Sequence, residues 1–136
     1  MNSNHPLPPP AFARLWFWGP VALYCALIFA LSSMSSVPAL PARISDKAAH
    51  ALLYAGLGFL VARGVSGGVA RRPSVRVAAV AIGFAAAYGL SDEVHQLFVP
   101  ARQFDWQDLL ADVCGAALGT AAWWLWGILR RIHDAV

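Results

Sequence analysis

Four apolar stretches, each close to the length that crosses a membrane, constrain what this chain can fold into. They run from about Leu15 to Ser33, Asp46 to Arg63, Val75 to Phe98 and Gln107 to Leu129. A helix needs roughly 20 residues to span a bilayer. Of the 136 residues, 59% are hydrophobic and only 12% are charged, whereas soluble domains have about 25% charged residues. The sequence therefore predicts an all-α polytopic membrane protein, a bundle of four transmembrane helices.

The length allows one compact unit. We expect residues 1–13, which are polar and proline-rich, to form a disordered tail, residues 14–131 to form the membrane domain, and residues 132–136 to form a short C-terminal tail. The first stretch and Val37-Pro38-Ala39 loosely imitate a signal peptide and its cleavage site. The stretch is long for that purpose, so a retained span is favoured, with cleavage as the open alternative.

The basic residues predict the orientation in the membrane. Seven of the ten Lys and Arg residues fall on one side of the predicted membrane: Arg14, Arg63, Arg71, Arg72, Arg76, Arg130 and Arg131. Arg43, Lys47 and Arg102 fall on the other side. By the positive-inside rule both termini are cytoplasmic, in the cytoplasmic (inner) membrane. Tryptophans near the ends of the stretches predict an aromatic belt: Trp16, Trp18, Trp106, Trp123, Trp124 and Trp126.

The same basic residues do not gather into a face for nucleic acid, so membrane lipids are the expected partners and no nucleic acid is expected. The oligomeric state stays open. Cys25 and Cys114 each lie within a predicted span and form no CxxC motif, which predicts buried, unreactive thiols.

A polar run, Ser91 to Phe98, closes the third apolar stretch. An Asp at the centre of a membrane helix costs roughly 2.5–3.5 kcal/mol, and less toward the ends. The ionisable residues of this run therefore need partners inside the bundle, and residues so placed are by default candidates for a functional site.

The short turn after Pro100 predicts an antiparallel hairpin of the third and fourth helices, with Glu93 and Asp108 at similar depth. One face of the fourth helix carries both acidic residues and glycines: Asp105, Asp108, Asp112, Gly115 and Gly119. The two glycines form a GxxxG motif, which lets a neighbouring backbone approach closely.

Polar groups of the other helices should converge on the same outward-facing pocket. One face of the second helix carries Asp46, His50 and Tyr54. Ser45 or Asp46 can cap the N-terminus of this helix. Arg102 offers a planar fork for a carboxylate or a phosphate, with an internal pair to Asp105 or Asp108 as the alternative.

Carboxylates crowded at low dielectric can retain a proton at neutral pH and act as acid or base, with a histidine as relay. The catalytic candidates are Glu93, His50 and His95. The binding candidates are Asp46, Lys47, Gln96, Arg102, Asp108 and Asp112. These side chains could also hold a divalent cation, but no spacing of the HExxH type occurs, so neither a metal site nor a cofactor is predicted. The alternatives are that the groups only pair with one another as polar glue between helices, and that Asp92 points into water.

The ordered set of these residues resembles the VanZ-like family over about residues 24–120. The pieces are Leu31-Ser32-Ser33, Asp46-Lys47 with His50 and Tyr54, the run from Asp92 to Pro100, Arg102, Asp105, Asp108 and the Gly115/Gly119 pair. The family is named for a member associated with low-level resistance to the glycopeptide teicoplanin. It commonly has Asn where this chain has Asp112. The resemblance implies a membrane protein, but no mechanism.

The leading hypothesis is a membrane protein that acts on the cell envelope or on glycopeptide access to it, by binding or modifying a cell-wall or lipid-linked precursor. The residues do not decide whether it is an enzyme. The alternative is a non-enzymatic binding or assembly protein whose polar cluster is packing glue. A subunit of a proton-coupled transporter is a third possibility, which the position of the acidic groups at one end, away from the midplane, disfavours.

Overall fold

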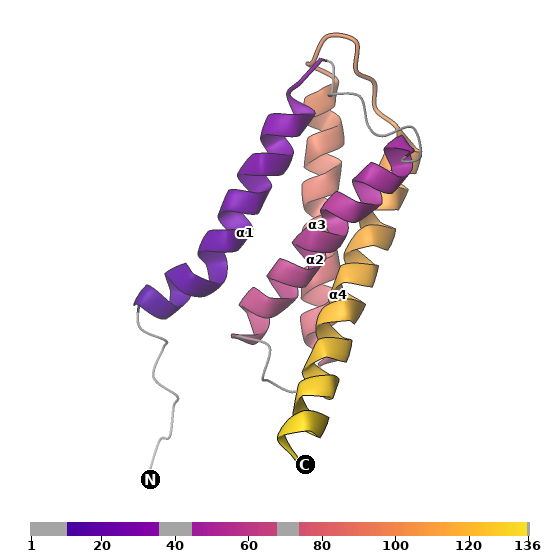
Figure 1. The fold of residues 1–136 in the computed structure, drawn as a ribbon. Coiled ribbons are helices and arrows are strands. Elements are labelled where there is room, and N and C mark those ends of the chain that lie inside the picture. Colours follow the sequence, from indigo (N-terminus) through magenta and orange to yellow (C-terminus); the bar gives the residue numbers. More distant parts are fainter. Residues whose placement is uncertain (1–10, 36–44, 68–73, 136) are drawn as a thin grey trace.

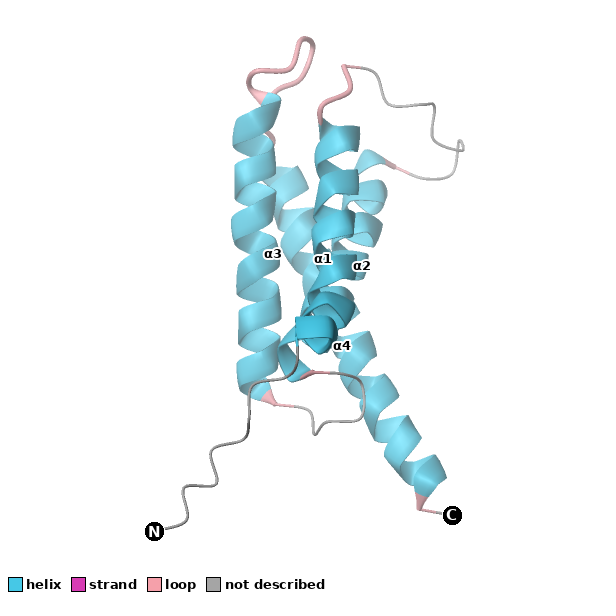
Figure 2. Cartoon of the chain, turned by 90° about the vertical axis from the view of Figure 1, so that its left-hand side faces the viewer, coloured by secondary structure: helices cyan, strands magenta, loops and turns pink. Residues whose placement is uncertain are grey.

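A computed structural model describes residues 11–35, 45–67 and 74–135, and in these ranges the chain is helical apart from its turns. The helices are α1 (Ala11–Ser32), α2 (Asp46–Ser66), α3 (Val75–Gln96) and α4 (Trp106–Asp134) (Figures 1 and 2). The described residues contain no strand. The predicted all-α fold with four membrane-length helices is therefore confirmed.

Three helices are longer than the apolar stretches that predicted them, and of these α2 ends at Ser66 where Arg63 was expected. The first begins at Ala11, within the segment expected to be a tail, and the last continues to Asp134. Basic side chains in the last turn of α4, Arg131 and His133, favour this extension because they complement the negative end of the helix dipole. Residues 1–10 of the expected tail lie outside the described residues.

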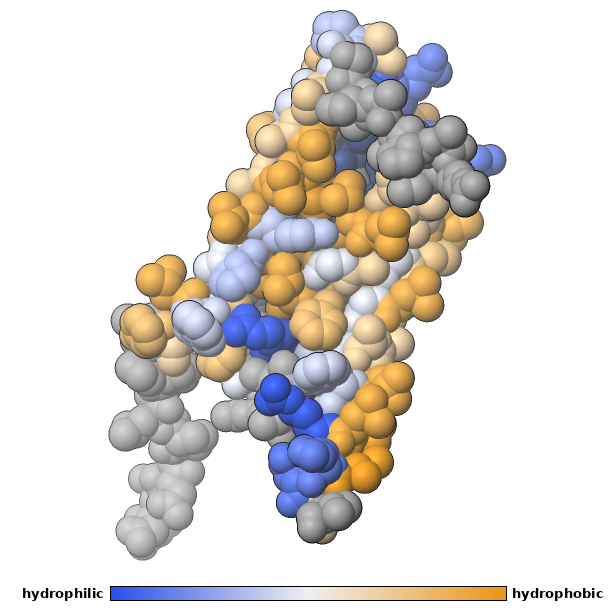
Figure 3. Space-filling model, viewed as in Figure 1, coloured by the Kyte–Doolittle hydropathy of each residue, from blue (hydrophilic) through white to orange (hydrophobic). Residues whose placement is uncertain are grey.

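All four helices are long and apolar enough to cross a membrane, with mean hydropathies between 1.3 and 1.8. Large apolar side chains cover the outside of the bundle, as in Leu23 (74% exposed) and Leu118 (67% exposed). Figure 3 shows that hydrophobic residues cover the middle of the bundle and that hydrophilic residues gather toward its ends. Such a surface requires lipid around it. The chain is a multi-pass membrane protein.

The start of α1 and the end of α4 lie at one end of the bundle, and the α3–α4 turn lies at the opposite end (Figure 1). We call the latter the turn end. An even number of spans places both termini on the same side of a membrane. Which side is cytoplasmic stays a prediction.

Helices α2 and α4 approach each other most closely, along a line of glycines. A Cβ atom added to Gly115 would overlap the backbone of Ala51, and one added to Gly119 would overlap the backbone of Ala55. Gly58 of α2 meets the backbone of α4 in the same way. The close approach predicted from the GxxxG motif is confirmed, and we call this contact the glycine seam.

Helix α1 is peripheral, since it packs against α2 and α3 but not against α4. The Tyr88 hydroxyl donates a hydrogen bond to the Cys25 carbonyl oxygen at 2.7 Å. At the other end of the helix, the guanidinium of Arg63 lies 5.2 Å from the centre of the Phe17 ring. The helix continues through Pro20, which sits in its first half.

Two expectations about single side chains were wrong. Trp123 belongs to the core and is 1% exposed, because it lies one turn beyond Gly119 on the face that meets α2. It is therefore not part of an aromatic belt. Cys114 is exposed on the surface of α4, and Cys25 is only half-buried.

Candidate functional site

The first turn of α2 directs two site residues toward α4. Ser45 caps the helix, and its side chain accepts a hydrogen bond from the Ala48 N–H at 3.2 Å. This start places Lys47 and His50, which are one turn apart, at the contact with α4.

Lys47 links the start of α2 to the start of α4. Its ammonium donates hydrogen bonds to carboxylate oxygens of both Asp105 and Asp108. The hydrogen bond from Lys47 holds the pKa of the Asp105 carboxyl below its ordinary value. An internal partner for these two aspartates was expected, but from Arg102. The structure gives that role to Lys47, whose helix packs directly against α4.

Asp105 connects three helices through three different groups. Its Oδ1 accepts from the Gln107 N–H at 2.8 Å and so caps α4. Its backbone N–H donates to Glu93 Oε2 on α3 at 2.9 Å. Its Oδ2 accepts from Lys47 of α2. Asp105 was not among the catalytic or binding candidates predicted from the sequence, although an Asp directly before a helix is a typical capping signal.

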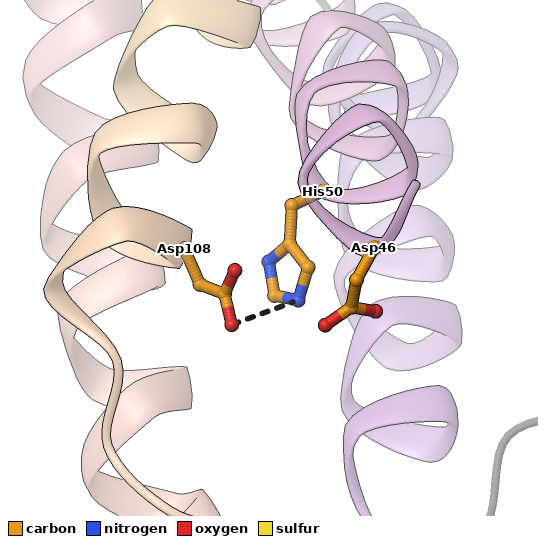
Figure 4. Close-up of side chains that lie close together, drawn as sticks. All are labelled: Asp46, His50 and Asp108. Carbon is orange, nitrogen blue, oxygen red and sulfur yellow. Dashed lines mark ion pairs between the residues drawn. The ribbon is translucent and has the colours of Figure 1, made fainter. Parts of the chain in front are cut away.

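His50 lies between carboxylates on both edges of its ring. Its Nδ1 is 2.9 Å from Asp112 Oδ1, and its Nε2 is 3.9 Å from Asp108 Oδ2. Asp46 lies on the other side of the same Nε2 and is exposed (Figure 4). The predicted convergence of α2 and the acidic face of α4 is thus seen in the structure.

Two carboxylates below His50 are fully buried. Glu93 and Asp112 are both 0% exposed. Glu93 Oε1 and Asp112 Oδ2 have no hydrogen-bond partner among the described residues, and the same holds for the buried hydroxyl of Tyr54. Buried polar oxygens are nearly always paired in proteins, so these atoms mark a place where a proton or a ligand is required.

Asp92 does not point into water as the alternative interpretation had it. It is 6% exposed and accepts a hydrogen bond from Gln96 Nε2 at 3.4 Å. Gln96 is buried as well, since it is 3% exposed. Both residues lie in the last turn and a half of α3, next to the turn.

An open pocket of about 400 Å³ lies at the turn end. It is lined by Asp46, Gln96, Ala101, Arg102, Gln103, Phe104, Asp105 and Asp108. Arg102 reaches it because Ala101 takes a left-handed conformation, with φ 65°, which reverses the chain after Pro100. Arg102 Nε donates to the Met34 carbonyl oxygen at 3.3 Å. No carboxylate of the described residues forms an ion pair with its guanidinium.

His95 lies elsewhere. Its Nε2 is 3.0 Å from the Ser33 hydroxyl, and its ring stacks at 4.6 Å on the ring of Phe29. Its contacts are therefore with α1 and the residue after it, outside the hydrogen-bond network around His50. A proton-relay role for His95 stays a prediction.

Two overlapping sets of side chains have the geometry to hold a metal ion, with one donor atom from each residue within 4.8 Å of the others. We call Asp46, His50 and Asp108 the rim triad, and His50, Glu93 and Asp112 the deep triad. The deep triad has no local signature in the sequence, because its members come from three different helices, whereas Asp46 and His50 of the rim triad are one turn apart in α2.

The VanZ/LLP1 family model matches residues 17–127, a range that includes every residue of the site. The chain belongs to the VanZ/LLP1 family. This membership confirms the resemblance inferred from the ordered polar residues. No curated protein and no solved structure matches the chain. For this VanZ/LLP1 protein, the function must therefore be argued from the pocket itself.

Proposed function

We propose that this VanZ/LLP1 protein binds a lipid-linked precursor of the cell envelope in the pocket at the turn end, on the outer face of the cytoplasmic membrane. The observation that carries the proposal is Arg102, which lines an open pocket of about 400 Å³ and forms no ion pair with a carboxylate of the part of the chain that the structure describes. Arginine binds phosphate through two parallel hydrogen bonds, which suits a lipid phosphate.

The position of the pocket along the bundle supports a ligand that is itself in the membrane. Phe98 is 81% exposed and Trp106 is 70% exposed, and both flank the α3–α4 turn. Exposed aromatic residues at helix ends are typical of the membrane–water interface. A ligand whose tail lies in the bilayer would place its head group at this level.

The charges of the pocket favour a head group that carries hydrogen-bond donors in addition to its negative charge. Asp46, Asp105 and Asp108 line the pocket together with Arg102. Two of these aspartates are paired with Lys47. A phosphate next to Arg102 would leave the acidic side of the pocket free for hydroxyl or amide groups, which carboxylates bind as acceptors. A phosphate carrying a sugar offers both.

A chemical step is compatible with this arrangement. Glu93 lies beneath the pocket, connected to it through the Asp105 N–H, and His50 links Asp112 to Asp108. In the proposal Glu93 acts as acid or base and His50 passes the proton. Binding or alteration of such a precursor would change the access of glycopeptides such as teicoplanin to the envelope.

Native mass spectrometry of the protein in nanodiscs, with a polyprenyl diphosphate sugar as probe, tests the binding. Wild type should retain the probe, and Arg102→Gln should bind it at least about tenfold more weakly, since a charged hydrogen bond contributes about 1.5–3 kcal/mol. Arg76→Gln is the matched control, because Arg76 is an exposed arginine at the opposite end of the bundle. Equal binding by Arg102→Gln and wild type would refute the proposal.

One observation favours a second candidate function, in which the polar cluster only holds helices together. Each charged contact of the cluster joins two helices or a helix and the turn, as Lys47 does with Asp108 and His50 with Asp112. In that case substitutions at Glu93, Asp108 and His50 should lower the amount of folded protein, and function should follow abundance. Lost function at unchanged abundance would exclude it.

A further inference from the structure

We propose that the deep triad, His50, Glu93 and Asp112, is a binding site for one divalent transition-metal ion of the Mn²⁺ or Zn²⁺ class. The three residues come from α2, α3 and α4, and each offers a donor atom within 4.8 Å of the other two. The proposal does not depend on the pocket's ligand. An ion here would replace the proton relay through His50 and Glu93, because both residues would then be metal ligands.

The second observation that points to a bound ion is the state of the two carboxylates. Glu93 and Asp112 are both 0% exposed, and each keeps one oxygen without a hydrogen-bond partner in the described residues. No lysine or arginine of the described part of the chain pairs with either. A buried carboxylate without a cation is costly, so such groups are paired or coordinate metals. A divalent ion at the triad would neutralise the two buried carboxylates.

The rim triad is the weaker of the two sets. Asp108 already accepts a hydrogen bond from the ammonium of Lys47, which would repel a second cation there. Asp46 is exposed, and Figure 4 shows it across His50 Nε2 from Asp108. The deep triad lies on the other ring nitrogen, since His50 Nδ1 faces Asp112.

The surrounding groups suit a metal at the deep triad. With an ion on Nδ1, the proton of the neutral imidazole lies on Nε2, where Asp108 Oδ2 is 3.9 Å away. At this distance Asp108 makes no hydrogen bond to Nε2, but its negative charge favours a proton on that nitrogen. One imidazole and two carboxylates favour Mn²⁺ or Zn²⁺ over Ca²⁺, which takes six to eight oxygen ligands. Three protein ligands leave a further position open.

Asp112 supplies one of the two buried carboxylates. Asp112→Asn keeps nearly the same shape, retains an acceptor for His50 and removes one charged ligand.

The test is metal content after full removal of any affinity tag. The purified full chain is stripped with chelator, equilibrated with Mn²⁺ or with Zn²⁺, and analysed by mass spectrometry for metal per chain and by electron paramagnetic resonance for Mn²⁺. Wild type should bind one ion per chain. Asp112→Asn and Glu93→Gln should each bind it at least about tenfold more weakly, while Asp46→Asn should bind it as wild type does.

Several outcomes would overturn the proposal. If wild type binds no stoichiometric ion, the two buried carboxylates must instead share a proton. Weakened binding in Asp46→Asn alone would move the ion to the rim triad. Binding that no variant changes would be adventitious. Glu93→Gln keeps the acceptor for the Asp105 N–H, so it provides a folded variant if Asp112→Asn does not fold.

Discussion

The contact between α2 and α4 is built in two different ways along its length. Its middle is the glycine seam, where Gly115 and Gly119 bring the backbone of α4 against Ala51 and Ala55. Its turn end is polar, where Lys47 and His50 meet aspartates of α4. The glycine seam depends on the small volume of its residues, and its packing involves no charged group. At this polar end, the two buried oxygens Glu93 Oε1 and Asp112 Oδ2 have no hydrogen-bond partner within the described ranges of the chain.

This contrast separates packing from chemistry within one interface. Close backbone contact between small residues is how membrane helices associate without a hydrophobic driving force. A seam of this kind can hold α2 and α4 together by itself. The polar residues beside it are then free to serve a ligand, and their substitution should affect function before it affects folding.

The largest effect is expected in the seam. Gly119→Ala places a Cβ against the backbone of Ala55, which cannot move without separating the helices. We expect a loss of about 3 kcal/mol in the free energy of unfolding, measured by denaturation in mild detergent. Gly83→Ala is the matched control, since nothing lies within 4 Å of its added Cβ. It should be neutral or gain up to about 1 kcal/mol. Equal behaviour of the two variants would disprove the seam.

The polar end should respond to acid in a way that the seam does not. Lys47 lowers the pKa of Asp105 in the folded protein, so this pair contributes stability that is fully present above the unfolded pKa of about 3.9. The contribution is lost as pH falls through the lower folded pKa. Asp105→Asn keeps a residue that can cap α4 but does not titrate, so its melting temperature should fall less than that of wild type below about pH 4.

Asp134→Asn is the control for this acid response, because Asp134 is an exposed residue at the far end of α4. Thermal unfolding from about pH 5 down to about pH 2 follows the loss of this contribution below the unfolded pKa. If Asp105→Asn and Asp134→Asn lose stability in parallel with wild type, the Lys47 pair does not contribute.

The smallest effect is expected in the turn that carries Arg102. Ala101 has φ 65°, a conformation that costs a residue with a Cβ about 1–2 kcal/mol. Ala101→Gly should therefore stabilise the protein by up to about 1 kcal/mol, after the greater entropy of glycine in the unfolded chain is allowed for. Ala87→Gly, at an exposed site within α3, should instead destabilise by about 1 kcal/mol. The same sign for both would mean that the turn is not strained.

The features that could be predicted from the sequence are those that depend on helical periodicity, namely which residues share one face of a helix. The spacing of Asp108, Asp112, Gly115 and Gly119 places them on one face, and the structure turns that face toward α2. The contact between His50 and the acidic face of α4 was predicted because both lie near the turn end. Family membership followed from the ordered polar residues.

What the sequence could not provide depends on contacts between helices and on the path of the turn. Arg102 was the only partner considered for Asp105, and the packing of α2 against α4 brings Lys47 to it instead. The burial of Asp92 could not be predicted because it depends on how α3 packs against the other helices, although its partner Gln96 is only one turn away in the sequence. The deep triad escaped notice for the same reason, since its three ligands come from three helices.

The central claim, that the polar end is a functional site and not packing glue, is tested most directly by Glu93→Gln. This change keeps the acceptor for the Asp105 N–H but removes the acid. A Gram-positive host expresses wild type or the variant, teicoplanin susceptibility is measured, and membrane abundance is quantified alongside. We expect reduced susceptibility with wild type and its loss with an equally abundant variant. Two results would contradict the account. One is a host expressing Glu93→Gln that is as resistant as a host expressing wild type, and the other is a loss of resistance that only follows a lower membrane abundance of the variant.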